Sequence, residues 1–194
     1  MSEEGVPAEL GVRRRADAIR NRDKLLAIAR ASFEDQRAEE VSMSSIARRA
    51  NVGMATLYRH FPSKRHLLEA LFTADVGDLC AAAAPIQGHT PGESFATWLR
   101  RFFEFAHSRN AVATELIIQY GGVDNPLFSH DRARICTAAQ PLVAAAQASH
   151  EFRDDLDIGQ MLDLMVAVAR VHGDANHVRP IADAALDGLR GGRR

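Results

Sequence analysis

Two short helical patterns, at residues 42–50 and 54–60, are separated by a single turn, and this arrangement constrains the fold more than any other feature. Ser42 is a favourable helix N-cap, and it opens the first pattern, which we expect to end at about Ala50. The apolar positions after the cap have helical spacing: Met43, Ile46 and Ala47. Residues 51–53 are expected to form the turn, because asparagine and glycine tolerate left-handed backbone angles.

The second short helix is expected to begin at Met54 and to end near Phe61, because Pro62 disfavours helical angles at the residue before it. Two short helices joined by a glycine-containing turn form a helix-turn-helix, here at about residues 43–62. In such a unit the first helix packs across the second, which stays prominent enough to enter a DNA groove. The residues expected to hold the two helices together are Ile46, Ala47, Val52 and Leu57.

Helical spacing continues through the rest of the chain, and no run alternates apolar and polar residues as a half-buried strand does. The predicted fold is therefore all-α. Ser63 is expected to cap a helix at 64–84, and Pro141 is expected to kink or split a helix at 127–150. The other helices are expected at residues 21–36, 93–108, 111–120, 157–172 and 179–189.

Charge divides the chain into a basic N-terminal part and an acidic remainder. Residues 11–65 hold thirteen Lys and Arg against six Asp and Glu, whereas residues 66–194 hold eleven against sixteen. This asymmetry is expected when one module meets a polyanion, although a solvated basic helix surface would give the same counts. The predicted organisation is a flexible basic arm at residues 1–20, a helix-turn-helix domain at 21–80 and a second helical domain at 81–194.

The remaining composition predicts a cytoplasmic protein without a membrane segment. Residues 1–15 are polar and charged and contain no apolar signal-peptide core. The most apolar stretch, residues 161–171, is about half as long as a membrane span and contains Asp163. Cys80 and Cys136 form no CxxC pair, so we interpret them as small apolar residues in a reducing compartment.

The second helix of the helix-turn-helix is expected to contact bases. Ala55 permits close approach and apolar contact with a thymine methyl group, and Thr56 reaches a phosphate or a base. Arg59 carries the fork of donors that pairs with guanine. Leu57 and Phe61 are interpreted as packing residues.

Phosphate contacts are expected beside these base contacts. Tyr58 and His60 are suited to phosphate oxygens. Lys64 follows the Ser63 cap at a helix N-terminus, whose dipole also favours an anion. The full set of predicted DNA contacts is Met54, Ala55, Thr56, Tyr58, Arg59, His60 and Lys64.

One run of residues matches a known pattern. It reads Ala50-Asn51-Val52, then Thr56-Leu57-Tyr58-Arg59-His60-Phe61-Pro62-Ser63-Lys64, then Leu67-Leu68. It resembles the helix-turn-helix of the tetracycline-repressor (TetR) family, and the resemblance covers about residues 21–76. The resemblance implies an all-helical homodimer, usually a repressor, that binds double-stranded operator DNA and releases it when a small molecule enters the C-terminal domain. It places the DNA contacts on the same seven residues.

Two residues depart from the family's usual pattern. Gly53 stands where many members have a serine, which removes a side-chain cap or a phosphate contact. Arg65 replaces a frequent glutamate, which adds positive charge near the DNA.

The C-terminal half contains candidate ligand and dimer surfaces. Residues 93–120 hold more aromatic and aliphatic side chains than one helical face can bury, so some are expected to line a cavity. The resemblance implies an effector there, and the expected contact residues are Trp98, Phe102, Tyr120 and Gln140. Apolar faces at residues 161–169 and 181–189 suit a four-helix bundle built by two copies. Ordinary packing within the chain is the alternative for both.

No catalytic or metal-binding motif competes with this reading, and no cofactor is expected. The eight histidines are scattered without an HExxH pattern, and the chain has no GxSxG motif or phosphate-binding glycine loop. Two other classes remain as alternatives: a small-molecule-binding helical protein with a vestigial helix-turn-helix, and an all-α enzyme. The intact run at residues 56–64 disfavours the first, and the missing motifs disfavour the second.

Overall fold

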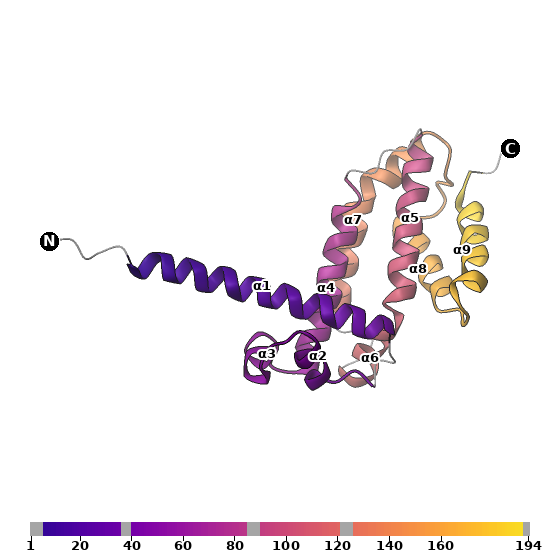
Figure 1. Cartoon of the computed structure of the whole chain (residues 1–194). Helices are drawn as coiled ribbons and strands as arrows, with labels where there is room; N and C mark the ends of the chain where they lie inside the picture. The colour runs from indigo at the N-terminus through magenta and orange to yellow at the C-terminus, as the bar shows by residue number, and fades with distance from the viewer. Residues whose placement is uncertain (1–5, 36–39, 85–89, 121–125, 192–194) are drawn as a thin grey trace. The chain divides into compact units, whose positions relative to one another are not determined.

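The computed structural model describes residues 6–35, 40–84, 90–120 and 126–191 (Figure 1). Within these residues all regular structure is helical apart from one isolated bridge between Phe152 and Arg190, which confirms the predicted all-α fold. The chain divides into two compact units, unit 1 (Met1–Leu71) and unit 2 (Phe72–Arg194). This division falls inside α4 (Lys64–Ala81), whereas the sequence placed a boundary at residue 80.

Unit 1 is built from α1 (Val6–Asp35), α2 (Met43–Arg49), α3 (Met54–His60) and the first part of α4. Its buried apolar residues are Leu25, Leu26, Ala29, Phe33, Val41, Ile46, Ala47, Ala50, Leu57, Phe61, Leu67, Leu68 and Leu71. Three of the four residues predicted to join the two short helices are therefore in the core, and Val52 is half-buried.

Both predicted helix caps next to the short helices are confirmed. The hydroxyl groups and backbone amides of Ser42 and Ser45 form a reciprocal capping box at the start of α2. Ser63 Oγ accepts from the backbone amide of His66 at 3.4 Å in the first turn of α4.

The turn after α2 closes with two backbone hydrogen bonds. The amide of Val52 donates to the carbonyl of Ala47 at 3.0 Å, and the amide of Asn51 donates to the carbonyl of Arg48 at 3.1 Å. Asn51 has a φ of 52°, so the expected left-handed angle is confirmed at this residue. Gly53 instead has an ordinary φ of −69°.

α1 begins at Val6, much earlier than the expected start at residue 21. Residues 6–20 of the predicted flexible arm are therefore helical, and residues 1–5 lie outside the described part of the chain. Pro7 is tolerated in the first turn of a helix, and Gly11 costs a helix interior only about 1 kcal/mol. The rest of this segment is rich in helix-forming Ala, Leu and Arg, so no local signal stops the helix.

α5 (Pro91–Ser108) is the centre of unit 2. It packs against α7 (Pro126–Ala148) and α8 (Ile158–Ala169), and α9 (Ala175–Leu189) packs on α8 (Figure 1). α6 (Asn110–Tyr120) follows α5 directly. The buried residues of α5 are Gly92, Phe95, Ala96, Trp98, Leu99, Phe102 and Phe103.

Pro141 lies inside α7, but the helix runs through it without a split. Proline removes one backbone donor and leaves the carbonyl four residues earlier without its partner. Pro141 is exposed, so water can satisfy that carbonyl group. Of the two predicted effects of Pro141, the split does not occur, and the kink stays a prediction.

Glu151 ties the turn after α7 to the start of α5. Its carboxylate accepts hydrogen bonds from the Thr90 hydroxyl, from the Ser149 hydroxyl at 2.8 Å and from the Gly92 amide at 3.1 Å. These hydrogen bonds, led by the one from Thr90, hold the pKa of Glu151 below its ordinary value of 4.5. A Cβ atom at Gly92 would lie 2.6 Å from Glu151 Cβ, so this close approach requires glycine.

Replacing Asn51 by valine should destabilise unit 1 by about 1–2 kcal/mol, because a β-branched residue is strained in the left-handed region. Asn51→Gly is the matched control and should be close to neutral, since glycine adopts this angle without strain. Chemical denaturation followed by circular dichroism measures both variants. Equal stability of Asn51→Val and the native protein would contradict the described turn.

Replacing Glu151 by glutamine should lower the Tm at neutral pH. Because the folded-state pKa of Glu151 is depressed, its ionised form stabilises the fold above the ordinary pKa of 4.5. This stability is lost as the pH falls through the lower folded-state pKa, so the Tm difference should shrink in acid. Thermal melts over a pH series measure it, and a difference that does not change with pH would show that the carboxylate charge is irrelevant.

Candidate nucleic-acid interface and ligand cavity

α3 buries one side and exposes the other. Leu57 is fully buried, whereas Met54 and Tyr58 are 38% and 46% exposed. Residues four apart lie on the same helix face, so the exposed residues form one continuous surface. These exposed residues are Met54, Ala55, Tyr58 and Arg59, with Thr56 and His60 half-buried at its edges. All six predicted contact residues of α3 are thus accessible, and we call this surface the α3 face.

Packing behind α3 holds this face outward. Leu57 and Phe61 enter the core of unit 1, and the amide of Phe61 donates to the carbonyl of Leu57 at 2.8 Å. The guanidinium group of Arg22 lies over the Phe61 ring, 5.4 Å from its centroid. The interpretation of Leu57 and Phe61 as packing residues is confirmed.

Gly53 is the N-cap of α3 and makes no side-chain cap. A Cβ atom at this position would meet no atom within 4 Å. Glycine is therefore not required by the packing or by the backbone angle, and a serine would fit here.

The start of α4 carries the seventh predicted DNA contact. Lys64 is its first residue and is half-buried. Arg65 Nε donates to Glu69 Oε1 at 2.7 Å, so the charge expected from Arg65 is partly balanced within the helix. Ser63 Oγ also lies 2.8 Å from Nδ1 of His66.

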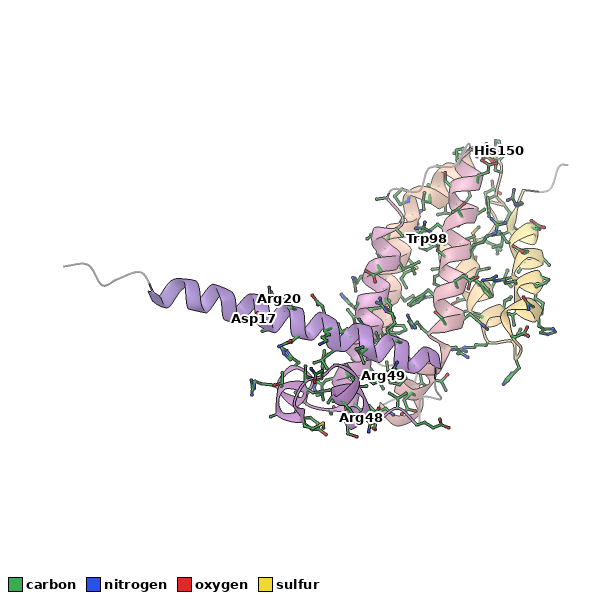
Figure 2. The ribbon with its side chains drawn as sticks, in the orientation of Figure 1. Asp17, Arg20, Arg48, Arg49, Trp98 and His150 are labelled. Atoms are coloured by element: carbon green, nitrogen blue, oxygen red, sulfur yellow. The ribbon has the colours of Figure 1, made fainter. Side chains whose placement is uncertain are left out.

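Two arginines of α2 were not among the predicted contacts. Arg48 is exposed in the last turn of α2, one turn before α3 (Figure 2). Arg49 donates from Nη1 to Ser32 Oγ at 2.8 Å. The excess of positive charge in residues 11–65 indicated that further basic residues could contact DNA, but it did not identify Arg48 among them.

Unit 2 contains a cavity of about 480 Å³. Small-molecule sites measure roughly 300–1,000 Å³ and are mostly apolar, with a few polar groups. The aromatic lining consists of Phe72, Phe102, Phe105 and Phe128. The charged lining consists of Arg109, Asp131, Arg132, Asp163 and Arg170.

The structure separates the four residues predicted to contact an effector. Phe102 lines the cavity. Trp98, which is labelled in Figure 2, does not line it. Its ring is fully buried, stacks on Phe102 with 6.0 Å between the ring centroids, and donates to the carbonyl oxygen of Leu79 at 3.4 Å. Gln140 is exposed on α7, away from the lining. The side chain of Tyr120 lies outside the described residues.

Two buried groups of the cavity wall hold α4. Arg109 donates from Nε to Asp75, and both side chains are buried. Asp131 is fully buried and accepts from Arg134 at 2.8 Å and from the Thr73 hydroxyl at 3.2 Å. Because Thr73 and Asp75 belong to α4, two separate sets of hydrogen bonds join the cavity wall to this helix.

Other candidate chemistries find little support in the described residues. Cys80 and Cys136 are half-buried, and burial raises the pKa of both thiols. Among the residues that the structure describes, no group of three His, Cys, Asp or Glu could hold a metal ion. In the same part of the chain, no helix is both long and apolar enough to cross a membrane.

Comparison with known proteins covers both units. Residues 25–71 match the family described as bacterial regulatory proteins, tetR family. Residues 90–191 match the transcriptional regulator SbtR-like, C-terminal domain. The HTH-type transcriptional regulator SAB2452 of Staphylococcus aureus is 45% identical over 53 residues, which are 27% of this chain. That alignment spans 29% of the relative, so the chain covers less than a third of its length.

Two solved structures are similar over nearly the whole chain. The TetR transcriptional regulator SCO0520 from Streptomyces coelicolor is 30% identical, with a TM-score of 0.70 over 89% of this chain and 99% of that one. The TetR transcription regulatory protein from Mycobacterium vanbaalenii is 32% identical, with a TM-score of 0.67 over 91% and 98%. Since the C-terminal family match alone spans more than half of the residues, this chain belongs to the tetR family of DNA-binding, helix-turn-helix transcriptional regulators.

Proposed function

We propose that the protein is a sequence-specific repressor that binds its operator as a homodimer and leaves it when a small molecule occupies unit 2. The observation that carries the DNA-binding part is the α3 face, where a seven-residue helix buries Leu57 and exposes Tyr58 and Arg59 beside the apolar Met54 and Ala55. The 480 Å³ cavity supports the small-molecule part.

Base contacts are assigned to the centre of the α3 face. Arg59 is exposed there and has the reach for bidentate pairing with guanine. Ala55 and Met54, also exposed, are proposed to make apolar contacts with thymine methyl groups. Thr56, at the edge of the face, donates to a base or a phosphate.

Phosphate contacts are assigned to the edges. Lys64 at the start of α4 supplies positive charge beside a helix N-terminus. Tyr58 and His60 are proposed to donate hydrogen bonds to phosphate oxygens. We add Arg48 to this group, because it is exposed one turn before α3.

Replacing Arg59 and Lys64 separately should distinguish the two kinds of contact. Arg59→Ala should cost roughly 1–3 kcal/mol on the operator and relax the preference at one base position per half-site. Lys64→Ala should weaken binding to all sequences about equally and lower the salt slope by about one unit per protomer. Arg65→Ala is the matched control, and its effect should be smaller because Glu69 already pairs with Arg65.

Fluorescence anisotropy on operator and scrambled DNA, over a salt series, measures all three variants. The region upstream of the protein's own gene is the first operator to test. If Arg59→Ala lowers affinity for both DNAs by the same factor, Arg59 contacts phosphate and not a base. If the native protein binds operator and scrambled DNA with equal affinity, the proposed sequence-specific repression is wrong.

The apolar surface that α8 and α9 leave exposed for a dimer contact is smaller than the sequence predicted. Most of the expected apolar residues are buried within unit 2 itself: Met161, Leu162, Met165, Val168, Ala169 and Leu189. Leu164 on α8 and Ile181 on α9 stay exposed, at 38% and 37%. Ala184 and Gly188 are also exposed and share a stripe of α9 with Ile181, at i+3 and i+7. We assign the homodimer contact to this stripe and to Leu164, since small residues let two helices approach closely.

Replacing Ala184 by arginine should convert the dimer into a monomer, because a long charged side chain cannot be buried between two apolar helices. Operator affinity should fall with it, since a monomer contacts one half-site. Asn176→Arg, in the first turn of α9, is the matched control and should stay dimeric. Light scattering measures the mass, and an Ala184→Arg protein that remains a dimer would place the interface elsewhere.

A further inference from the structure

The charged residues that line the cavity are almost all neutralised by pairing. Arg132 makes a two-pronged ion pair with Asp163, with distances of 2.7 and 3.1 Å, and donates to the carbonyl of Gly159 at 3.2 Å. The hydrogen bonds that Arg132 donates to Asp163 raise the pKa of Arg132 above its ordinary value. Arg109 is paired with Asp75 in the same way, as described above.

The two carboxylates of the lining have both oxygens occupied. Asp131 accepts through Oδ1 from Arg134 and through Oδ2 from Thr73. Asp163 accepts through both of its oxygens from Arg132. A cationic ligand would therefore meet only carboxylates whose charge a guanidinium group already balances, so its attraction to either of them is weaker than to an unpaired carboxylate.

Arg170 is the exception among the charged lining residues. It is the C-cap residue of α8, and its amide donates to the carbonyl of Val166 at 3.2 Å. Its guanidinium group is accessible and makes no hydrogen bond or ion pair with any residue in the described part of the chain. The lining thus carries one positive charge that its own carboxylates do not balance.

The rest of the lining suits an apolar body. Phe72 and Phe128 meet edge to face with their ring centroids 5.3 Å apart, and Phe72 and Phe105 lie 5.7 Å apart. These aromatic rings favour an aromatic or aliphatic ligand, because binding removes apolar surface of both the ligand and the rings from water. Besides the paired charges, the polar groups left to recognise a ligand are the cavity's unbalanced cation and the side chain of Asn110.

We propose that the cavity takes an apolar molecule with a single anionic group, such as an aryl-substituted carboxylic acid, whose carboxylate pairs with Arg170. This proposal rests on the effector role assigned to the cavity above. A dianion would leave its second charge unpaired in a mostly apolar site, and a neutral molecule could accept a hydrogen bond from the guanidinium group but could not form an ion pair with it. Arg170 is a specificity-determining residue, and the phenylalanine rings hold the body of the ligand.

Three probes of one size test the chemistry: 4-phenylbutyrate, its neutral amide 4-phenylbutyramide, and 4-phenylbutylamine. Isothermal titration calorimetry on the full-length protein gives their Kd values. Trp98 is the chain's single tryptophan and stacks on Phe102, so its fluorescence should change when the cavity fills. The acid should bind about tenfold more tightly than the amide, and the amine should bind most weakly.

Substitution of Arg170 assigns the preference to one residue. Arg170→Gln should weaken binding of the acid about tenfold and leave the amide unchanged, whereas Arg170→Lys should keep part of the preference. Arg101→Gln is the matched control, because Arg101 is exposed on α5 and does not line the cavity. Equal affinity for acid and amide, tighter binding of the amine, a preference that survives Arg170→Gln, or no binding of any probe would each overturn the proposal.

Operator binding measured in parallel separates this proposal from the function on which it rests. Binding of the acid that depends on Arg170 supports the ligand class, whatever its effect on DNA. If that binding leaves operator affinity unchanged, the effector role proposed for the cavity fails and the ligand class stands. If the operator is bound but no probe enters the cavity, the ligand class fails and DNA binding stands.

Discussion

A seven-residue helix is not stable in water by itself, because isolated helices shorter than about 12 residues are marginal even with favourable sequences. α3 therefore depends on what it buries. Leu57 and Phe61 are its two anchors in the core of unit 1, and Arg22 covers the Phe61 ring from α1. With one face fixed in this way, the other residues of α3 are free to be chosen for contact and not for packing. The proposed DNA recognition depends physically on this separation of packing residues from exposed residues within one short helix.

In unit 2 the main constraint is the pairing of charged side chains around the cavity. A buried charge without a partner costs several kcal/mol, so the buried carboxylates of Asp75 and Asp131 are each paired with a guanidinium group. Asp131 lies on α7 and accepts a hydrogen bond from Thr73 of α4. Asp75 lies on α4 and accepts one from Arg109, the C-cap residue of α5. Pairing of these charges therefore also joins different helices. Within such a network, one accessible arginine changes the electrostatic character of the whole cavity. The charge that a ligand must carry is then set by the one unpaired guanidinium group, and the paired charges of the lining contribute little to this selectivity.

Local signals account for what could be predicted from the sequence. The caps at Ser42 and Ser63, the left-handed Asn51 and the stop before Pro62 each act within a few residues, and the structure has all four features where the sequence placed them. The early start of α1 was missed because a flexible arm and an unobstructed helix have the same local composition. The cavity lining was beyond local reasoning: periodicity identified α5 as apolar, but which ring faces the cavity depends on α4, α7 and α8. Trp98 and Phe102 lie one turn apart on α5, yet only Phe102 lines the cavity.

The two cysteines have a practical consequence for work on this protein. The thiolate is the form that reacts with oxidants and alkylating reagents, and burial raises the pKa of both Cys80 and Cys136. Both therefore remain protonated at neutral pH and react slowly with air or maleimides. A new cysteine placed at exposed Met54 would be modified first, so a dye or a cross-linker could be attached to the α3 face without removing either native thiol.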